Sequence, residues 1–213
     1  YGYAHVPWMS RRQQMIPSDA MPTPEERLSL FEAARKLFLW DGYQEIGIDH
    51  FAKPSDGMAR AQVAGRLKRN FQGYTDDTSP VLIGIGASSI SRFPQGFAQN
   101  ASATAAHVKA IREGRFSVHR GHAFSGEDTL RARIIEALMC DFAVRREELL
   151  TNFATTEARL DDLFQAAKAT FGDMLRVTDE GVFIPEKARP LTRMIARAFD
   201  AYDTAQARHS SAV

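Results

Sequence analysis

The feature that most constrains the fold is a strongly indicated helix over residues 23–40. Thr23 can cap its first turn, Pro24 suits the first helical position, and Glu26 stands three residues after the cap. Gly42 follows the last turn, where glycine commonly ends a helix. Apolar residues share one face, which predicts that the helix packs on a sheet; they are Leu28, Phe31, Ala34, Leu37 and Phe38.

The segments on either side of this helix are predicted to be strands. Residues 3–6 and 43–51 have the composition of strands, and with the helix they predict a parallel strand–helix–strand unit. Residues 7–22, between the first strand and the helix, form a long irregular stretch rich in Gln, Arg, Met and Pro. Such a stretch is either a functional lid or a surface excursion without a role.

The chain changes character near Ser125. Before this point short helices and strands alternate, and after it the chain is mostly helical apart from a small hairpin with Glu180-Gly181 at its centre. The sequence therefore predicts an α/β part and a compact, mostly α-helical domain, with a boundary near 115–125. The expected helices are 56–68, 101–113, 127–140, 146–151, 156–171 and 185–207, and the expected extended segments are 81–85 (buried), 116–124 and the hairpin 177–184.

Composition argues against several classes of protein. The net charge is +1, whereas a nucleic-acid-binding protein usually gathers a basic excess on one face, so we expect no nucleic-acid partner. The single cysteine, Cys140, leaves no intrachain disulfide and fits a reducing, cytoplasmic compartment. No apolar run reaches the ~18 residues of a membrane span, and no export signal is visible. The chain starts without Met, so we expect it to begin within a fold.

Two segments combine residue types that bind ligands. Residues 66–75, Arg-Leu-Lys-Arg-Asn-Phe-Gln-Gly-Tyr-Thr, bring cations that pair with carboxylates next to aromatic faces that suit a flat ligand. The alternative is a solvated basic helix end followed by a turn. Residues 84–90, Gly-Ile-Gly-Ala-Ser-Ser-Ile, follow a predicted strand. Their glycines either let the backbone approach a ligand or make a plain tight turn.

A third candidate segment is residues 46–52, Ile-Gly-Ile-Asp-His-Phe-Ala. Strand alternation places Asp49 and Phe51 on one face and His50 on the other. Charged residues at the carboxyl ends of barrel strands are often functional. Alternatively, Asp49 caps the next helix, or His50 is a hydrogen-bonded core histidine. The other histidines are scattered and predict no metal site, and Cys140 is expected to be a small buried apolar residue.

Several strings, taken in order, resemble oxygen-independent coproporphyrinogen III oxidases, the HemN family. They are Tyr-Ala-His-Val-Pro at 3–7, Ile-Asp-His-Phe-Ala at 48–52, Arg-Asn-Phe-Gln-Gly-Tyr-Thr at 69–75, the glycine segment at 84–90, Ala-Gln-Asn at 98–100 and Ile-Ile-Glu-Ala-Leu-Met-Cys at 134–140. Each string is weakly specific alone, but the ordered set is strongly specific and covers nearly the whole chain.

This resemblance implies a radical S-adenosylmethionine enzyme with a [4Fe–4S] cluster. Such enzymes convert two propionate side chains of coproporphyrinogen III to vinyl groups, giving protoporphyrinogen IX without oxygen in haem biosynthesis. The implied fold is the last strands and helices of an incomplete parallel α/β barrel over residues 1–120. A helical accessory domain, the family's carboxy-terminal domain, would follow over 121–213.

The sequence also departs from the family. The Cys-x3-Cys-x2-Cys motif is absent, and one cysteine cannot supply three thiolates, so we expect the chain alone to bind no cluster and to be inactive without the missing amino-terminal half. The resemblance implies cofactor contacts by Ala4 and Ile90, and it places Phe71 and Gln72 near the active site. The chemistry of arginine adds Arg69 as a partner of a substrate propionate.

The sequence leaves two alternatives open. The haem-chaperone branch of the same superfamily binds haem, but it has a different string where residues 69–75 stand here. A non-catalytic interaction module is the second alternative, because helices with the hairpin at 177–184 are compatible with a winged-helix-like domain. Asp179 and Glu180 on that hairpin would repel phosphate, which argues against DNA or RNA binding.

Overall fold

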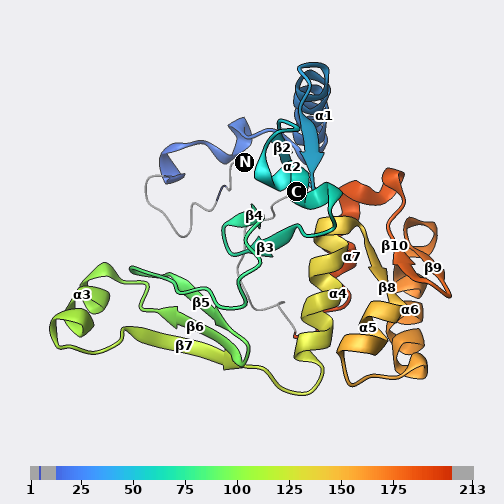
Figure 1. The fold of residues 1–213 in the computed structure, drawn as a ribbon. Coiled ribbons are helices and arrows are strands. Elements are labelled where there is room, and N and C mark those ends of the chain that lie inside the picture. The colour runs from blue at the N-terminus through green and yellow to red at the C-terminus, as the bar shows by residue number, and fades with distance from the viewer. Residues whose placement is uncertain (1–4, 6–12, 203–213) are drawn as a thin grey trace.

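The computed structural model describes His5 and residues 13–202, and the predicted strand at 3–6 lies largely outside this part. Three regions are visible: a long helix with a small hairpin, a flat arm, and a helical domain (Figure 1). Two short 3-10 helices, η1 (Gln13–Met15) and η2 (Ser18–Ala20), come before the long helix. They are short regular elements within residues 7–22, which were predicted to be irregular.

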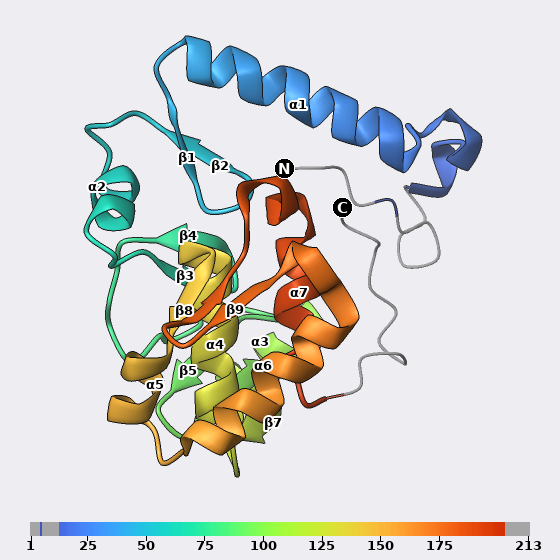
Figure 2. The same ribbon diagram turned by 90° about the vertical axis from the view of Figure 1, so that its right-hand side faces the viewer.

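The long helix α1 (Pro24–Trp40) begins as predicted. The Thr23 hydroxyl accepts the Glu26 backbone N–H at 3.2 Å, and the Glu26 carboxylate accepts the Thr23 N–H at 2.8 Å, which completes a capping box. Gly42 follows the helix with φ +77°, as the predicted terminator. The expected packing on a sheet is observed in part. Phe31 and Phe38 contact the Phe51 ring of the strand that follows, with centroids 6.3 and 4.9 Å apart, although no residue of α1 is fully buried. Figure 2 shows α1 lying across the edge of the molecule.

The predicted parallel strand over 43–51 is wrong. Residues 44–52 fold back as an antiparallel hairpin of β1 (Gln44–Ile46) and β2 (His50–Ala52). The turn forms at Gly47, whose φ of +57° suits glycine, and a Cβ there would come within 2.0 Å of the Tyr74 ring. The close approach of this ring therefore fixes the turn.

A small core forms below this hairpin. Asp56 caps α2 (Gly57–Val63) by accepting the Met58 N–H at 2.8 Å, and the helix ends before the predicted 68. A second antiparallel hairpin follows, made of β3 (Lys68–Asn70) and β4 (Gly73–Thr75). The buried residues of this core are Ile46, Ala52, Ala59, Leu67, Tyr74 and Cys140.

The arm is a three-stranded antiparallel sheet of order β5-β6-β7, with a helix at its far end (Figure 1). Its elements are β5 (Ile90–Phe93), β6 (Gly96–Asn100), α3 (Thr104–Arg112) and β7 (Val118–Ala123). The predicted buried strand at 81–85 is wrong. Leu82 makes one bridge to Arg92, and Val81, Ile83 and Ile85 are exposed.

The helical domain matches its prediction closely. Helices α4 (Asp128–Asp141), α5 (Arg146–Asn152) and α6 (Glu157–Phe171) lie within a residue of the expected bounds. A 3-10 turn, η3 (Gly172–Met174), leads into the predicted hairpin, β9 (Arg176–Thr178) and β10 (Gly181–Phe183). The short strand β8 (Ala143–Arg145), which was not predicted, pairs with β10, so the sheet has the order β8-β10-β9.

The last predicted helix, 185–207, is interrupted. Residues Glu186–Leu191 form a 3-10 helix, η4, and α7 spans only Thr192–Arg197. Pro190 lies inside the first of these, where it cannot donate a backbone hydrogen bond and so prevents a continuous α-helix. Helices α4 to α7 and the small sheet enclose the main core, which contains Leu130, Ile134, Leu138, Leu149, Leu160, Phe164, Leu175, Val182, Ile195 and Phe199.

The described chain is thus a mixture of helices and strands in which every strand pair is antiparallel. Strand β7 crosses residue 120, where one predicted domain was to end. Among the contacts that join the two cores, the Tyr74 hydroxyl donates to the Met139 carbonyl at 2.7 Å. This contact holds the β3–β4 hairpin on the end of α4.

Candidate functional site

A cavity of about 780 Å³ lies where three regions of the chain meet. One wall is the β3–β4 hairpin with the loop after it, another is the root of the arm, and the third is formed by α4 and α7 (Figure 1). The residues that line it are Lys68, Arg69, Asn70, Phe71, Thr75, Asp77, Thr78, Ser79, Pro80, Val81, Leu82, Arg92, Phe97, Phe124, Ala132, Ile135, Glu136, Met139, Arg193, Ala196, Arg197 and Asp200.

The cavity has an apolar side built from three phenyl rings. Phe97 packs edge-on against Phe71, with ring centroids 5.3 Å apart, and against Phe124 at 5.0 Å. Phe71 is 51% exposed, so much of its ring is available to a ligand. Aromatic rings in this arrangement present both faces and edges to a conjugated or pyrrole-like group.

The remaining wall is cationic. Five of the lining residues are Lys or Arg, and three are Asp or Glu. Guanidinium groups bind carboxylates through paired hydrogen bonds, and a partly desolvated setting strengthens the attraction. A ligand that suits this cavity therefore carries carboxylates around an apolar framework. The cations are Lys68, Arg69, Arg92, Arg193 and Arg197, and the acids are Asp77, Glu136 and Asp200.

Arg69, a predicted site residue, lies on the cavity wall. Its guanidinium carbon is 5.0 Å from the centroid of the Tyr74 ring, which supports it from one side. Its Nε is buried and has no hydrogen-bond partner among the described residues. Burial raises the pKa of Tyr74 to about 12, so this ring stays neutral beneath the arginine. The Tyr74 ring therefore holds the Arg69 side chain in place, and the buried Nε–H of Arg69 has no acceptor among the described residues.

Glu136 organises the cationic wall next to α4. Its carboxylate lies 3.0 Å from Lys68 and 3.1 Å from Arg133, and it is 3.9 Å from Arg92. Its side chain is 12% exposed, whereas that of Arg92 is 45% exposed. Glu136 therefore neutralises Lys68 and Arg133 and leaves Arg92 able to meet a ligand from the arm.

Asp49, another predicted site residue, does not line the cavity. Its carboxylate accepts a hydrogen bond from Arg193 Nη2 and lies 2.8 Å from His50 Nδ1. Arg193 does line the cavity, so Asp49 acts on the site through the arginine that it holds. The alternative that Asp49 caps the next helix is wrong, because Asp56 occupies that cap. The partly buried, hydrogen-bonded His50 agrees with its structural interpretation.

The residues implied by resemblance are divided between the cavity and other places. Phe71 lines the cavity, whereas Gln72 is exposed in the β3–β4 turn, where its backbone N–H donates to Asn70 at 2.8 Å. Ile90 lies in β5 opposite Gln99 and is not part of the lining. Ala4 lies outside the described residues. The cofactor roles of Ala4 and Ile90 stay predictions.

The glycine segment at 84–90 is a tight turn held by hydrogen bonds from the Asn100 side chain. The Asn100 side chain donates to the carbonyls of Gly84 and Gly86 and to the Ser89 hydroxyl, at 3.3, 3.0 and 3.0 Å. A Cβ on Gly84 would meet the Ile90 backbone at 2.8 Å, and Gly86 has φ +100°. Packing and conformation thus account for both glycines.

The described residues do not fit an iron–sulfur cluster. Cys140 is 1% exposed, and burial raises the pKa of its thiol to about 12, which disfavours the thiolate that binds iron. No group of three or more His, Cys, Asp or Glu side chains in the described part of the chain is arranged to hold a metal ion. Cys140 is a buried apolar residue, as predicted.

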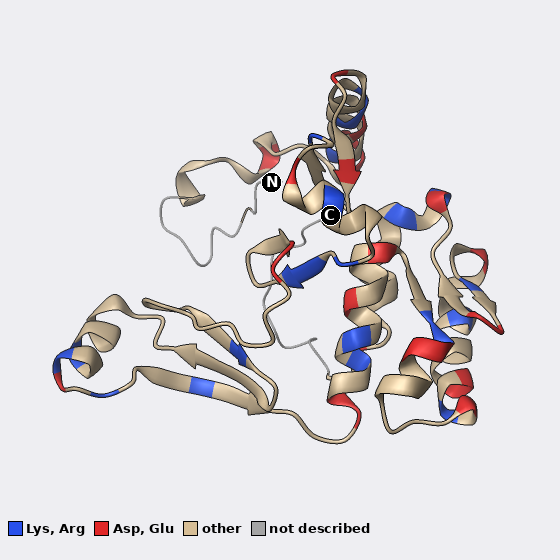
Figure 3. Ribbon diagram, in the orientation of Figure 1, with Lys and Arg blue, Asp and Glu red and all other residues tan. Residues whose placement is uncertain are grey.

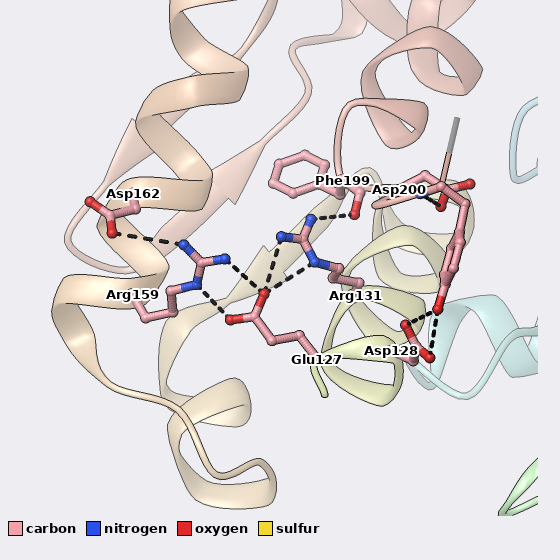
Figure 4. A network of polar contacts seen from close by, with 8 residues as sticks. Glu127, Asp128, Arg131, Arg159, Asp162, Phe199 and Asp200 are labelled. Carbon is pink, nitrogen blue, oxygen red and sulfur yellow. Dashed lines mark hydrogen bonds and ion pairs between the residues drawn. The ribbon is translucent and has the colours of Figure 1, made fainter. Parts of the chain in front are cut away.

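A polar network holds the start of α4 against the rest of the helical domain (Figure 4). Glu127 binds Arg159 of α6 at 2.5 and 2.8 Å and Arg131 at 3.2 Å. Arg131 Nη1 also donates to the Phe199 carbonyl at 2.9 Å. These contacts fix α4 relative to the segment after α7, and both helices line the cavity.

Sequence reasoning missed most of the cationic wall. Arg92, Arg193 and Arg197 stand in segments with no motif, and they meet Lys68 and Arg69 only in the folded chain. The spacing of Arg193 and Arg197 indicates that the two share one helical face, but not which residues they face. Phe97 and Phe124 were missed for the same reason.

Comparisons with known proteins agree on one family, although no family model matches the chain. The solved structure titled "Coproporphyrinogen III oxidase (HemN) from Escherichia coli is a Radical SAM enzyme" matches with a TM-score of 0.86 and 30% identity, over 94% of this chain and 47% of that one. The chain therefore shares its fold with part of a radical SAM enzyme.

The sequence relatives are more specific. A protein of Paracoccus denitrificans named "Oxygen-independent coproporphyrinogen III oxidase" is 62% identical over all 213 residues, which cover 47% of that protein. A protein of the same name from Cereibacter sphaeroides is 57% identical over 95% of this chain and 45% of its own length. The chain is therefore related to the oxygen-independent coproporphyrinogen III oxidases along its whole length. It spans about half the length of these relatives.

Proposed function

We propose that this chain is the carboxy-terminal part of a cytoplasmic enzyme that decarboxylates coproporphyrinogen III without oxygen. Two propionate side chains would become vinyl groups, giving protoporphyrinogen IX in haem biosynthesis. S-adenosylmethionine and a [4Fe–4S] cluster would supply the radical chemistry when bound, and the cluster ligands would come from the other half of the protein. The described part of the chain has no helix long and apolar enough to cross a bilayer.

The chain's own contribution would be to bind and orient the substrate. The observation that carries this proposal is the cavity that combines five cations with three phenyl rings. Coproporphyrinogen III carries propionates around an apolar tetrapyrrole, so carboxylates would meet the cationic wall while pyrrole rings contact the phenyl side. Arg69 is the first candidate for a propionate partner, because its buried Nε is without a hydrogen-bond partner among the described residues.

We further propose that the uncovered apolar residues of the first region contact the other half of the same protein. Helix α1 has no buried residue, with Leu37 66% and Trp40 87% exposed, and Ile83 and Ile85 are also exposed. In the whole enzyme these segments would complete a parallel barrel. Residues 1–120 would then belong to that barrel and 121–213 to the accessory domain.

The experiment is an anaerobic assay of the full-length protein and its Arg69→Ala variant. We expect the variant to raise the KM for coproporphyrinogen III roughly tenfold or more, because a charge-assisted hydrogen bond is lost. Arg66→Ala is the matched control, since Arg66 is exposed on the same segment outside the cavity lining. Equal KM values for both variants would contradict a role for Arg69.

Two further measurements separate the alternatives. The 213-residue chain alone should take up no iron and sulfide on anaerobic reconstitution, and a stoichiometric [4Fe–4S] spectrum would contradict this. A haem titration of the full-length protein distinguishes the haem-chaperone alternative. Tight stoichiometric haem binding without decarboxylation would favour the chaperone and overturn the proposed reaction.

A further inference from the structure

The arm concentrates positive charge in a chain that is almost neutral overall. Residues 78–126 contain five Lys or Arg and one acidic residue, Glu113, so this segment carries a net charge of +4. The whole chain carries +1, so the rest is net negative. Figure 3 shows this distribution, with basic residues on the arm and mixed charges on the helical domain. A dipolar arrangement of this kind orients the molecule toward an anionic partner.

Much of this charge lies at the tip of the arm, where α3 ends and β7 begins. Lys109, Arg112 and Arg115 are all exposed there. Arg115 forms an ion pair with Glu113, and two cations of the tip remain in excess over the acid. The tip projects away from both cores of the molecule (Figure 1).

Large apolar side chains stand among these cations. Phe116 is 92% exposed, and Ile111 and Val118 are each 54% exposed. The tip is nevertheless well built, because Ser117 between them is buried. Its hydroxyl lies 2.6 Å from His107 Nδ1, and its carbonyl accepts the Ala101 N–H at 2.8 Å. These anchors fix the loop so that the residues on either side of Ser117 face outward.

We propose that this tip docks on an anionic phospholipid surface. Phe116, with Ile111 and Val118, would insert among the headgroups, while Lys109, Arg112 and Arg115 would pair with lipid phosphates. Exposed apolar residues flanked by cations are the pattern of peripheral membrane anchors. A narrow projecting tip also suits a fluid interface better than a protein interface, which typically needs ~800 Å² of matched surface on each partner.

The root of the same arm reaches the candidate site. Arg92, Phe97 and Phe124 lie near this root and line the cavity. Docking of the tip would therefore hold the cavity at a fixed orientation to the membrane, with the arm as the spacer. The docking proposal rests on the charge and exposure of the tip, and it does not depend on the reaction proposed above.

The test is co-sedimentation of the full-length protein with vesicles. Vesicles of phosphatidylcholine with a third phosphatidylglycerol should bind the protein, and pure phosphatidylcholine vesicles should bind it much less. The Arg112→Glu/Arg115→Glu variant should lower binding to anionic vesicles at least about tenfold. Phe116→Ser should lower it several-fold, because apolar insertion is lost.

Matched controls separate the tip from the rest of the surface. Arg145→Glu changes an arginine that is 69% exposed on β8, and Met194→Ser removes an apolar side chain that is 61% exposed on α7 and lies outside the cavity lining. Both controls should bind like the wild type, and circular dichroism should show all variants folded. The proposal is overturned if anionic vesicles do not bind the protein. It is also overturned if the controls lose as much binding as the tip variants, or if Phe116→Ser binds normally.

Discussion

The helical domain and the region before it differ in how completely they cover their own apolar surface. In the helical domain, Phe164 and Phe199 are 0 and 1% exposed within a core of many residues. In the first region, α1 has no buried residue, and the small core holds six residues, one of which, Cys140, comes from α4. The helical domain therefore covers most of its own apolar surface, whereas the first region leaves large apolar side chains exposed.

The first prediction concerns the largest expected effect. Phe164→Ala should lower the free energy of unfolding by about 3–5 kcal/mol, because it empties a closed site beside Phe199. Leu37→Ala on α1 should change it by no more than about 0.5 kcal/mol in this chain, because that side chain is 66% exposed. Urea denaturation of both variants measures the contrast. Similar losses would mean that α1 is packed in solution and that the two regions do not differ as described.

The second prediction concerns the joint between the two cores. Tyr74→Phe removes a hydroxyl that accepts the Ile48 N–H at 3.0 Å and donates to the Met139 carbonyl at 2.7 Å. Two backbone groups lose a partner, so unfolding should become easier by about 1–3 kcal/mol. Tyr43→Phe, just before β1 and outside both cores, is the control, and its effect in the same denaturation should be much smaller. A neutral Tyr74→Phe would show that this hydroxyl contributes nothing to holding the two regions together.

The third prediction concerns Asp49, which connects the first region to a cavity residue on α7. In Asp49→Asn the ion pair to Arg193 is weakened, and the arginine is less firmly held on the cavity wall. On the proposed function, KM of the full-length protein for coproporphyrinogen III should rise several-fold with little change in kcat, because Asp49 itself does not line the cavity. Steady-state kinetics measure this split, with Asp41→Asn as the control, since Asp41 pairs with Lys53 on the surface. A fall in kcat alone would instead point to a direct role in the reaction.

Local features of the chain could be predicted from sequence because local physics decides them. The capping box at Thr23 and Glu26, the helices of the carboxy-terminal domain and the hairpin around Glu180-Gly181 all depend on neighbouring residues. The predicted strand at 43–51 failed because Gly47 turns the chain where the Tyr74 ring, far along the sequence, requires glycine. Local pattern contains no information about such a contact.

The cavity also shows that local sequence does not predict contacts between distant residues. Arg69 and Phe71 could be proposed from their dense local composition, and both line the cavity. Arg92, Arg193 and Arg197 could not, because their neighbours in sequence are unremarkable and only the packing of α7 and the arm brings them together. The expectation that α1 covers a sheet followed from its apolar face. Phe31 and Phe38 do contact Phe51 of the β1–β2 sheet, but Leu37 of the same face stays exposed.

The smallest expected effect concerns pH and the polar network within the helical domain. Hydrogen bonding to Arg159 lowers the pKa of Glu127 to about 2, below the ordinary 4.5. Because the folded-state pKa is depressed, the stabilisation is complete above about pH 4.5 and is lost as the pH falls from there through about 2. The side chains of Glu127 and Arg159 are 35% and 41% exposed, so solvent screens the pair and it contributes at most about 1 kcal/mol to stability.

Glu127→Gln tests this contribution by urea denaturation at a series of pH values. The variant should be slightly less stable than the wild type at pH 7, and the difference should shrink steadily as the pH falls below about 4.5. Glu147→Gln, an exposed glutamate on α5, controls for the loss of one carboxylate. A difference that stayed constant with pH would mean that Glu127 contributes through packing rather than charge.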